Sequence, residues 1–81
     1  MEEVKQIIAT DLPEIDKLAQ AFRLITDQAV EYAQYEIELA RAMKDQETVV
    51  KQQIKMETIK HARSILQDCY MLVTRRRAWD E

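Results

Sequence analysis

Residues 14–43, EIDKLAQAFRLITDQAVEYAQYEIELARAM, carry the pattern that decides the fold. Apolar side chains recur there in steps of three and four, and Glu36 is the one exception in the series. A pattern held over four heptads predicts an amphipathic α-helix with an a/d seam, about 45 Å long at about 1.5 Å per residue. Ala19, Ala33 and Ala40 lie beside the seam, where a neighbouring backbone could approach closely. The seam itself consists of Ile15, Leu18, Phe22, Ile25, Ala29, Tyr32, Glu36, Leu39 and Met43.

The segment that follows, residues 44–48 with the sequence KDQET, contains no apolar side chain and predicts a turn. Asp45 or Thr48 could cap the helix that begins after it. A second helix is predicted over residues 49–78, because its apolar side chains fall within one half of a helical wheel. Two helices of equal length around a short polar turn predict an antiparallel hairpin. The half-wheel is formed by Val50, Ile54, Thr58, Ile59, Ala62, Ile65, Leu66, Cys69, Leu72 and Val73.

Residues 1–10 predict a short helix or arm, since Val4, Ile7 and Ile8 share one small apolar face. Pro13 disfavours helical geometry at the preceding residue and therefore separates this arm from the long helix. Asp11 and Glu14 have the spacing of a capping box. The whole chain, residues 1–81, is predicted to form one helical domain.

Composition excludes the other fold classes. The 81 residues include no Gly, no Asn and a single Pro, so the tight turns of an all-β or α/β fold have no suitable residues. No apolar stretch approaches the roughly 20 residues that span a bilayer, and the acidic start does not predict a signal peptide. One Cys cannot form an internal disulfide, which is typical of a reducing compartment, so we expect a cytoplasmic protein.

Charge and hydrophobicity together predict self-association. Residues 1–47 carry a net charge of −6 and residues 48–81 a net charge of +3, which favours pairing the two long helices. The apolar half-wheel of residues 49–78 is wider than one partner helix can cover, so a homodimer in the form of a four-helix bundle is expected. The alternative is one continuous helix through residues 44–48 in a long antiparallel coiled-coil dimer, although the seam changes position after Met43. The expected assembly residues are Ile15, Leu18, Phe22, Ile25, Leu39, Ile59, Leu66 and Val73.

Isolated residues that could carry chemistry have simpler structural interpretations. His61 follows Glu57 by four residues, whereas di-iron bundles use a spacing of three, so a solvated pair is expected. Glu36 is interpreted either as a polar seam residue that fixes the register by facing a Lys or Arg of another helix, or as a position exposed to solvent. Cys69 is interpreted as an unreactive core residue. Tyr32 is interpreted as a core tyrosine whose hydroxyl reaches the boundary, rather than as half of a stacking pair with Tyr35.

The C-terminal cluster Arg75-Arg76-Arg77, followed by Trp79, is the one place where cations and an aromatic ring adjoin. Arg and Trp can bind phosphate and stack a base, so nucleic-acid binding is the alternative function. The chain has no Gly-rich phosphate loop or nucleophile elbow, and no cofactor or metal site is predicted. Small helical dimers of the chorismate mutase type are enzymes, but the surroundings of Arg23, Arg41 and Lys44 do not reproduce that family's pattern.

Residues 32–42, YAQYEIELARA, the polar turn and the ending RRRAW over residues 75–79 resemble the short helical-hairpin accessory proteins of tailed bacteriophages. The resemblance covers roughly residues 26–79, is one of style, and transfers no functional residue. It implies a phage or prophage protein that binds another protein or supports DNA metabolism. Our main hypothesis is therefore a non-enzymatic helical interaction module that binds itself and an unidentified protein partner.

Overall fold

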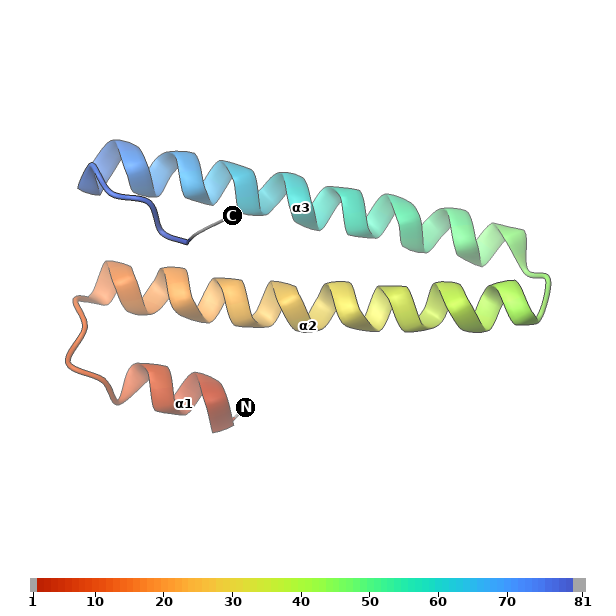
Figure 1. The fold of residues 1–81 in the computed structure, drawn as a ribbon, viewed down its shortest axis with the longest axis horizontal. Coiled ribbons are helices and arrows are strands. Elements are labelled where there is room, and N and C mark those ends of the chain that lie inside the picture. Colours follow the sequence, from red (N-terminus) through yellow and green to blue (C-terminus); the bar gives the residue numbers. More distant parts are fainter. Residues whose placement is uncertain (1, 80–81) are drawn as a thin grey trace.

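The computed structural model describes residues 2–79, which form three α-helices and no strand. The helices are α1 (Glu2–Ile8), α2 (Glu14–Ala42) and α3 (Gln46–Thr74). Helices α2 and α3 lie side by side and antiparallel, and α1 folds back along the other side of α2 (Figure 1). The predicted all-α class and the antiparallel hairpin are thus confirmed. A continuous helix through residues 44–48 is excluded, because the chain reverses there.

The reversal is built from polar residues without a glycine. Lys44 adopts a left-handed conformation with φ 58°, and the Asp45 N–H bonds the Ala40 carbonyl at 2.8 Å. Asp45 then caps α3: its carboxylate accepts bonds from the Thr48 backbone N–H at 3.2 Å and from the Thr48 hydroxyl at 2.6 Å. Because Asp45 provides the cap, α3 begins at Gln46, three residues before the predicted start.

The start of α2 differs from the sequence prediction. Pro13 occupies the N-cap position with φ −55°, and no side chain caps the helix, so the capping box proposed for Asp11 and Glu14 is wrong. The Pro13 carbonyl accepts bonds from the N–H groups of Asp16 and Lys17, each at 3.0 Å. The fixed φ of Pro13 already matches helical geometry. Helix α2 therefore begins although no side chain accepts a hydrogen bond from its first backbone N–H groups.

The two long helices meet along the alanine row of α2, rather than along its a/d seam. Ala19, Ala33 and Ala40 are at most 4% exposed, and Ile37 is the one larger α2 side chain buried with them. Since alanine projects only a methyl group, the α3 backbone can approach this row closely. The larger seam residues are therefore displaced to one side of the contact, where many remain in solvent.

Two apolar clusters hold the hairpin together, one near each end. At the turn end, Ile37, Ala40 and Val49 pack with half-buried Met56. At the open end, Ala19, Tyr70 and Trp79 are buried together with several half-buried neighbours. The second cluster is completed by Ile15, Phe22, Leu66 and Ala78.

An ion pair lies between these clusters. The Arg63 guanidinium of α3 donates from Nη1 to Asp27 Oδ1 of α2 at 2.6 Å. The Arg63 side chain is 12% exposed, whereas that of Asp27 is 46% exposed. A guanidinium so far removed from water needs an anionic partner, so Asp27 fixes the pairing of the helices at this level.

Helix α3 ends at Thr74, four residues before the predicted end, because Arg75 takes a left-handed conformation with φ 60°. Its backbone N–H bonds the Met71 carbonyl at 2.8 Å. The chain then turns back and runs beside α2 and α3 (Figure 1). We call residues 75–79 the C-terminal strap. It carries Trp79 into the core, where the side chain is 3% exposed.

Replacing Ala33 by Leu tests the alanine contact. Ala33 is completely buried, so the extra side chain must push the helices apart, and unfolding free energy should fall by about 1–3 kcal/mol. Denaturant titration followed by circular dichroism measures the loss. Ala42→Leu, at an exposed position of the same helix, is the matched control. An equal effect of both substitutions would contradict the close approach at Ala33.

Acid should remove the contribution of the Asp45 cap. Hydrogen bonds from the Thr48 hydroxyl and backbone N–H lower the pKa of Asp45. A carboxylate with a lowered folded-state pKa stabilises the fold above its ordinary pKa of about 4, and this contribution is lost as pH falls through the folded value. The stability difference between wild type and Asp45→Ala should therefore shrink between pH 6 and pH 2. Asp45→Asn, which keeps an uncharged cap, should show a much smaller change in thermal midpoint relative to Asp45→Ala over this range.

Candidate functional site

The largest unexplained feature of the molecule is a stripe of exposed apolar side chains on both long helices. On α2, Leu18, Ile25, Tyr32 and Leu39 recur at every seventh residue, with Leu18 60% and Tyr32 58% exposed. Helix α3 contributes side chains that are exposed to a similar or greater extent. We call the exposed set on the side away from the C-terminal strap the apolar face: Leu18, Ile25, Tyr32 and Leu39 of α2, Met43 directly after α2, and Val73 of α3. Ile54, Ile65 and Leu72 are exposed too, but helical periodicity places them together on the outer surface of α3, away from α2.

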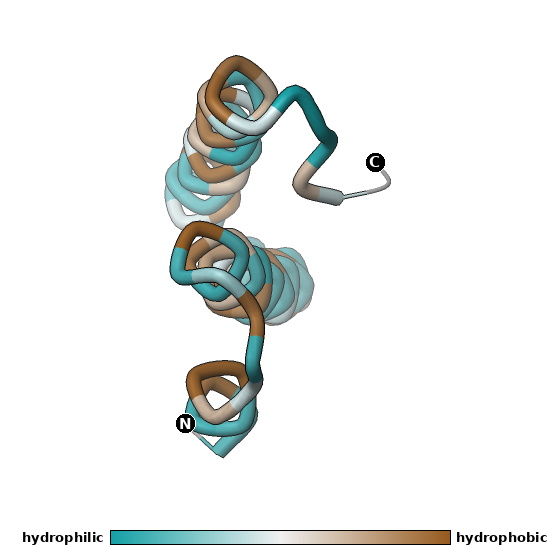
Figure 2. The backbone as a smooth tube through the Cα atoms, turned by 90° about the vertical axis from the view of Figure 1, so that its left-hand side faces the viewer, coloured by the Kyte–Doolittle hydropathy of each residue, from teal (hydrophilic) through white to brown (hydrophobic). Residues whose placement is uncertain are grey.

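Contacts between the helices place the two halves of the apolar face on the same side of the hairpin. Near the open end, Leu18 and Val73 border one apolar groove, whose floor includes Leu66 and Tyr70. In the middle, the Lys55 ammonium of α3 lies 5.8 Å from the centre of the Tyr32 ring. Figure 2 shows hydrophobic backbone positions of α2 and α3 on the side away from the C-terminal strap. The apolar face therefore runs along α2 and extends onto α3 at Val73.

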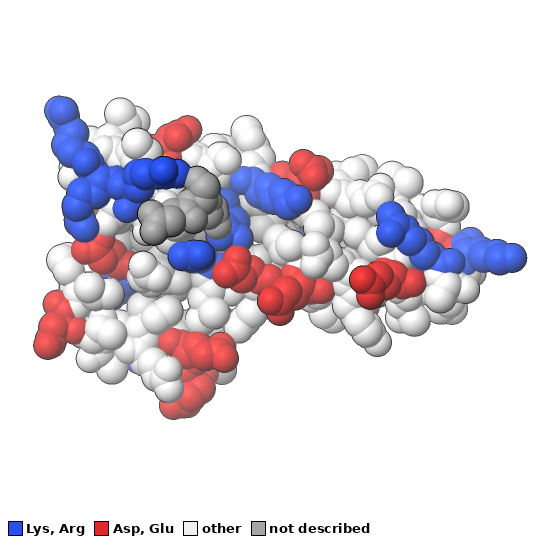
Figure 3. Space-filling view, viewed as in Figure 1, with Lys and Arg blue, Asp and Glu red and all other residues white. Residues whose placement is uncertain are grey.

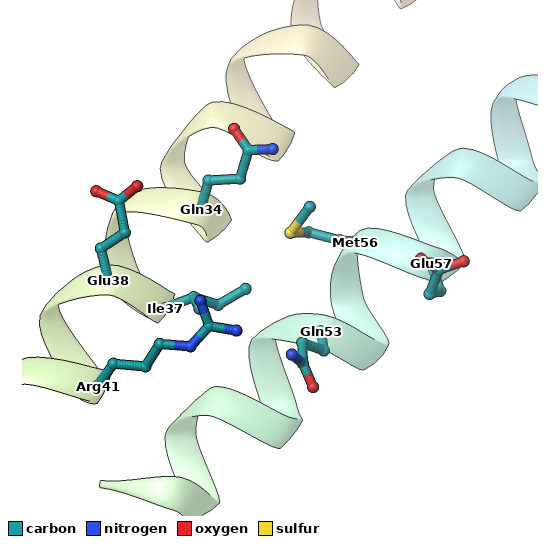
Figure 4. Close-up of a pocket in the computed structure, with 7 residues that line it drawn as sticks. All are labelled: Gln34, Ile37, Glu38, Arg41, Gln53, Met56 and Glu57. Atoms are coloured by element: carbon teal, nitrogen blue, oxygen red, sulfur yellow. The ribbon is translucent and has the colours of Figure 1, made fainter. Parts of the chain in front are cut away.

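The opposite side of the hairpin is polar. Charged side chains of both signs are spread over it, around the C-terminal strap (Figure 3). Near the turn end it is hollowed into a groove of about 680 Å³ between α2 and α3. Figure 4 shows the Arg41 guanidinium extending across this groove toward Gln53, while Glu38 points away from it. The groove is open and is lined by Gln34, Ile37, Glu38, Arg41, Gln53, Met56 and Glu57.

The residues near this polar groove that the sequence singled out are exposed. Glu57 is exposed and lies 3.9 Å from the Lys60 ammonium, and His61 is also exposed. His61 lines a shallow apolar depression on the outer surface of α3. Within residues 2–79, no three His, Cys, Asp or Glu side chains converge in a way that could hold a metal ion. None of the three helices in this range is long and apolar enough to cross a bilayer.

The structure divides the residues expected in the oligomer interface into two groups. Leu18, Ile25, Leu39 and Val73 are exposed members of the apolar face. The other four are half-buried inside the hairpin, and Phe22 stacks on Trp79 with ring centres 6.3 Å apart. Sequence periodicity could not separate the groups, because both belong to the same apolar half of each helix. The half-buried group consists of Ile15, Phe22, Ile59 and Leu66.

Three residues have surroundings that differ from the sequence interpretation. Cys69, expected in the core, is exposed at the rim of the apolar groove, because α3 turns Leu66 and Tyr70 toward α2 instead. Tyr32 is exposed rather than buried. Its hydroxyl bonds the Glu36 carboxylate one turn later, which raises the pKa of Tyr32. Glu36 thus has a partner on its own helix and not a cation from another.

The C-terminal cluster does not form the arrangement expected for stacking a base. Arg75, Arg76 and Arg77 are exposed, but Trp79 is buried between the helices. Arg76 lies against Tyr70, with its guanidinium 5.6 Å from the ring centre and 3.4 Å from Asp16 Oδ1. The indole is therefore part of the core in this conformation, and only the arginine side chains face solvent.

Tyr70 connects the open end of the hairpin to the C-terminal strap. Its hydroxyl donates a hydrogen bond to Asp16 Oδ1, the carboxylate that also faces Arg76. This hydrogen bond and burial raise the pKa of Tyr70, against an opposing effect of Arg76. Sequence reasoning missed this group, because residues 16, 70 and 76 come together only after the chain has reversed twice.

Raising the pH above 9 should lower the stability of the fold, because the Tyr70 phenol loses its proton. Because its folded-state pKa is raised, the protonated phenol stabilises the fold below the ordinary pKa of about 10, and this contribution is lost as pH rises toward the folded value. The thermal midpoint should fall between pH 9 and pH 11, and less steeply for Tyr70→Phe. Tyr35→Phe, which removes an exposed phenol, is the control. Equal slopes for Tyr70→Phe and wild type would exclude the link to Asp16.

The chain was compared with protein-family models, curated proteins and solved structures, and none of the three comparisons found a match.

Proposed function

We propose that this protein is a non-enzymatic helical interaction module that dimerises through its apolar face. The observation that carries the proposal is the exposure of large hydrophobic side chains in a stripe along α2 that extends onto α3 at Val73, with Leu18 60% and Val73 71% exposed. Isolated exposed hydrophobic residues are common on proteins, but a contiguous patch of this kind is typical of a binding surface.

The spacing of the stripe favours a helical partner. Leu18, Ile25, Tyr32 and Leu39 repeat every seven residues, which is the period of side chains that interlock with another helix. A second copy of the hairpin offers the same repeat, so two copies related by a two-fold axis would form a four-helix bundle. Helix α1 packs on α2 and makes no contact with α3.

The small core supports a second copy as the partner. Among residues 2–79, seven hydrophobic side chains are buried, and three of these are alanines. A chain of this size buries too little apolar surface to be robust alone, and oligomerisation is a common remedy. A copy of the same chain is always present during folding, whereas a different partner is not.

Charge favours one orientation of the dimer. Residues 1–47 have a net charge of −6 and residues 48–81 a net charge of +3. A two-fold axis that places α2 on the α3 helix of the partner brings opposite charges together, whereas α2 on α2 brings acidic helices together. We also propose that the protein has an accessory role in the host cytoplasm and binds a protein partner there. The resemblance to phage accessory proteins supports this part of the proposal.

Light scattering on a sizing column tests the dimer. Wild type should elute with twice the mass of one chain at micromolar concentration. Ile25→Lys places a charge in the apolar face and should give a monomer, because two such charges would be buried at the interface. Gln34→Lys adds the same charge at an exposed position on the polar side of α2 and should remain dimeric. A monomeric wild type would contradict the proposal.

A further inference from the structure

The place where Trp79 is held has the properties of a peptide-binding site. Its indole N–H donates to the Ala19 carbonyl at 3.2 Å, and its ring lies parallel to that of Phe22, with an interplanar angle of 9°. The Arg63 guanidinium lies 5.4 Å from the centre of the ring. One acceptor, one aromatic ring and one cation on the hairpin thus recognise a single side chain.

The backbone of the C-terminal strap is recognised as well. The Gln67 carboxamide accepts a bond from the Ala78 N–H at 2.6 Å and donates one to the Trp79 carbonyl at 3.0 Å. A side-chain amide that pairs with both the N–H and the C=O of an extended chain binds backbone without regard to its side chains. The contacts described above that hold Ala78 and Trp79 therefore come from α2 and α3.

The residues that connect α3 to this site are exposed: Arg75, Arg76 and Arg77. Of these, Arg76 also contacts the hairpin, through Tyr70 and Asp16. Arg75 holds the left-handed conformation that a residue with a Cβ adopts at a cost, and the reversal of the chain depends on it. A strap that continued away from its own helix would relieve Arg75 and could make the same contacts with another molecule.

We infer that the site formed by Ala19, Phe22, Arg63 and Gln67 binds the C-terminal strap of a second copy of this chain as well as its own. The occupant is named by the structure, because Ala78 and Trp79 are seated in the site and every copy carries them. The short tether gives the chain's own strap a high effective concentration, so exchange between copies requires that one strap be lost or that copies be crowded.

This inference deepens the proposed self-association by adding a second contact on the opposite side of the hairpin. The apolar face and the C-terminal strap lie on different sides (Figure 2). A dimer formed through the apolar face would therefore leave both strap sites accessible. Exchange of straps between such dimers would join them into larger assemblies. The strap contact and the apolar-face contact lie on different sides of the hairpin, so together they do not complete a closed dimer.

Complementation between two full-length variants tests the exchange. Trp79 is the sole tryptophan, so a Trp79→Ala chain has an intact site and no tryptophan signal. A Gln67→Ala chain keeps the tryptophan but lacks the amide that holds its backbone, and its emission should be red-shifted relative to wild type. Adding excess Trp79→Ala chain should restore the wild-type emission maximum and raise the emission anisotropy. The double variant Gln67→Ala/Trp79→Ala is the control acceptor and should change neither quantity.

The outcomes separate the inference from the dimer proposal. The same titration with Ile25→Lys added to every chain should still restore the emission, because the apolar face is not involved. A wild-type emission maximum in Gln67→Ala alone would overturn the role of Gln67. No shift with a hundredfold excess of folded acceptor would overturn the exchange and leave a strap that binds only its own chain. If circular dichroism shows that Trp79→Ala is not helical, Trp79→Phe replaces it as acceptor, because phenylalanine can stack on Phe22 but lacks the indole N–H that binds the Ala19 carbonyl, so a tryptophan strap displaces it.

Discussion

The close contact between α2 and α3 along Ala19, Ala33 and Ala40 is the constraint on which the rest of the structure depends. Methyl groups let the two backbones approach, and the helices gain dispersion contacts along their length. The same approach admits seam side chains such as Ile15 and Phe22 only at the open end of the hairpin and leaves Leu18, Ile25, Tyr32 and Leu39 outside the contact. Those side chains emerge on one side, which creates the apolar face. A hairpin closed by leucines at the same positions would have buried its hydrophobic surface and offered none to a partner.

The open end of the hairpin is closed by a different principle. Helix α3 stops at Thr74, and the reversal at Arg75 lets Trp79 fill the space beside Ala19 and Phe22 that small side chains leave empty. Polar groups accompany the indole: Gln67 binds the backbone of the C-terminal strap, and Arg63 pairs with Asp27 beside the ring. An exposed C-terminal segment would contribute nothing to the core, whereas this one supplies its largest aromatic side chain. The strap also gives the two sides of the molecule different characters, one apolar and one polar.

These two features suggest a division of roles between the sides. The apolar face offers a long, repeated hydrophobic stripe that suits another helical hairpin, and self-association is the proposal it supports. The polar side holds a groove with Arg41 and a site already filled by the chain's own strap. Binding is the function we propose for both sides, because directional groups such as Gln67 and the Ala19 carbonyl hold the backbone and the indole of the C-terminal strap.

The sequence alone determined the helices and the turn, because each depends on neighbours within a few residues: the hydrophobic period and the absence of apolar side chains over residues 44–48. It left the cap of α3 open between Asp45 and Thr48, and it marked the alanine row as a place where a neighbouring backbone could approach. Only the tertiary structure decided that the alanines, and not the seam, face α3, since both choices bury a similar apolar stripe and differ only in how closely the backbones approach. The exposure of Cys69 and Tyr32 and the burial of Trp79 depend on which side of α2 faces α3. A rotation of each helix by a fraction of a turn exchanges buried and exposed positions, and the hydrophobic period does not specify that rotation. The strap site joins Ala19 and Trp79, which are 60 positions apart in the sequence, so no local pattern encodes it.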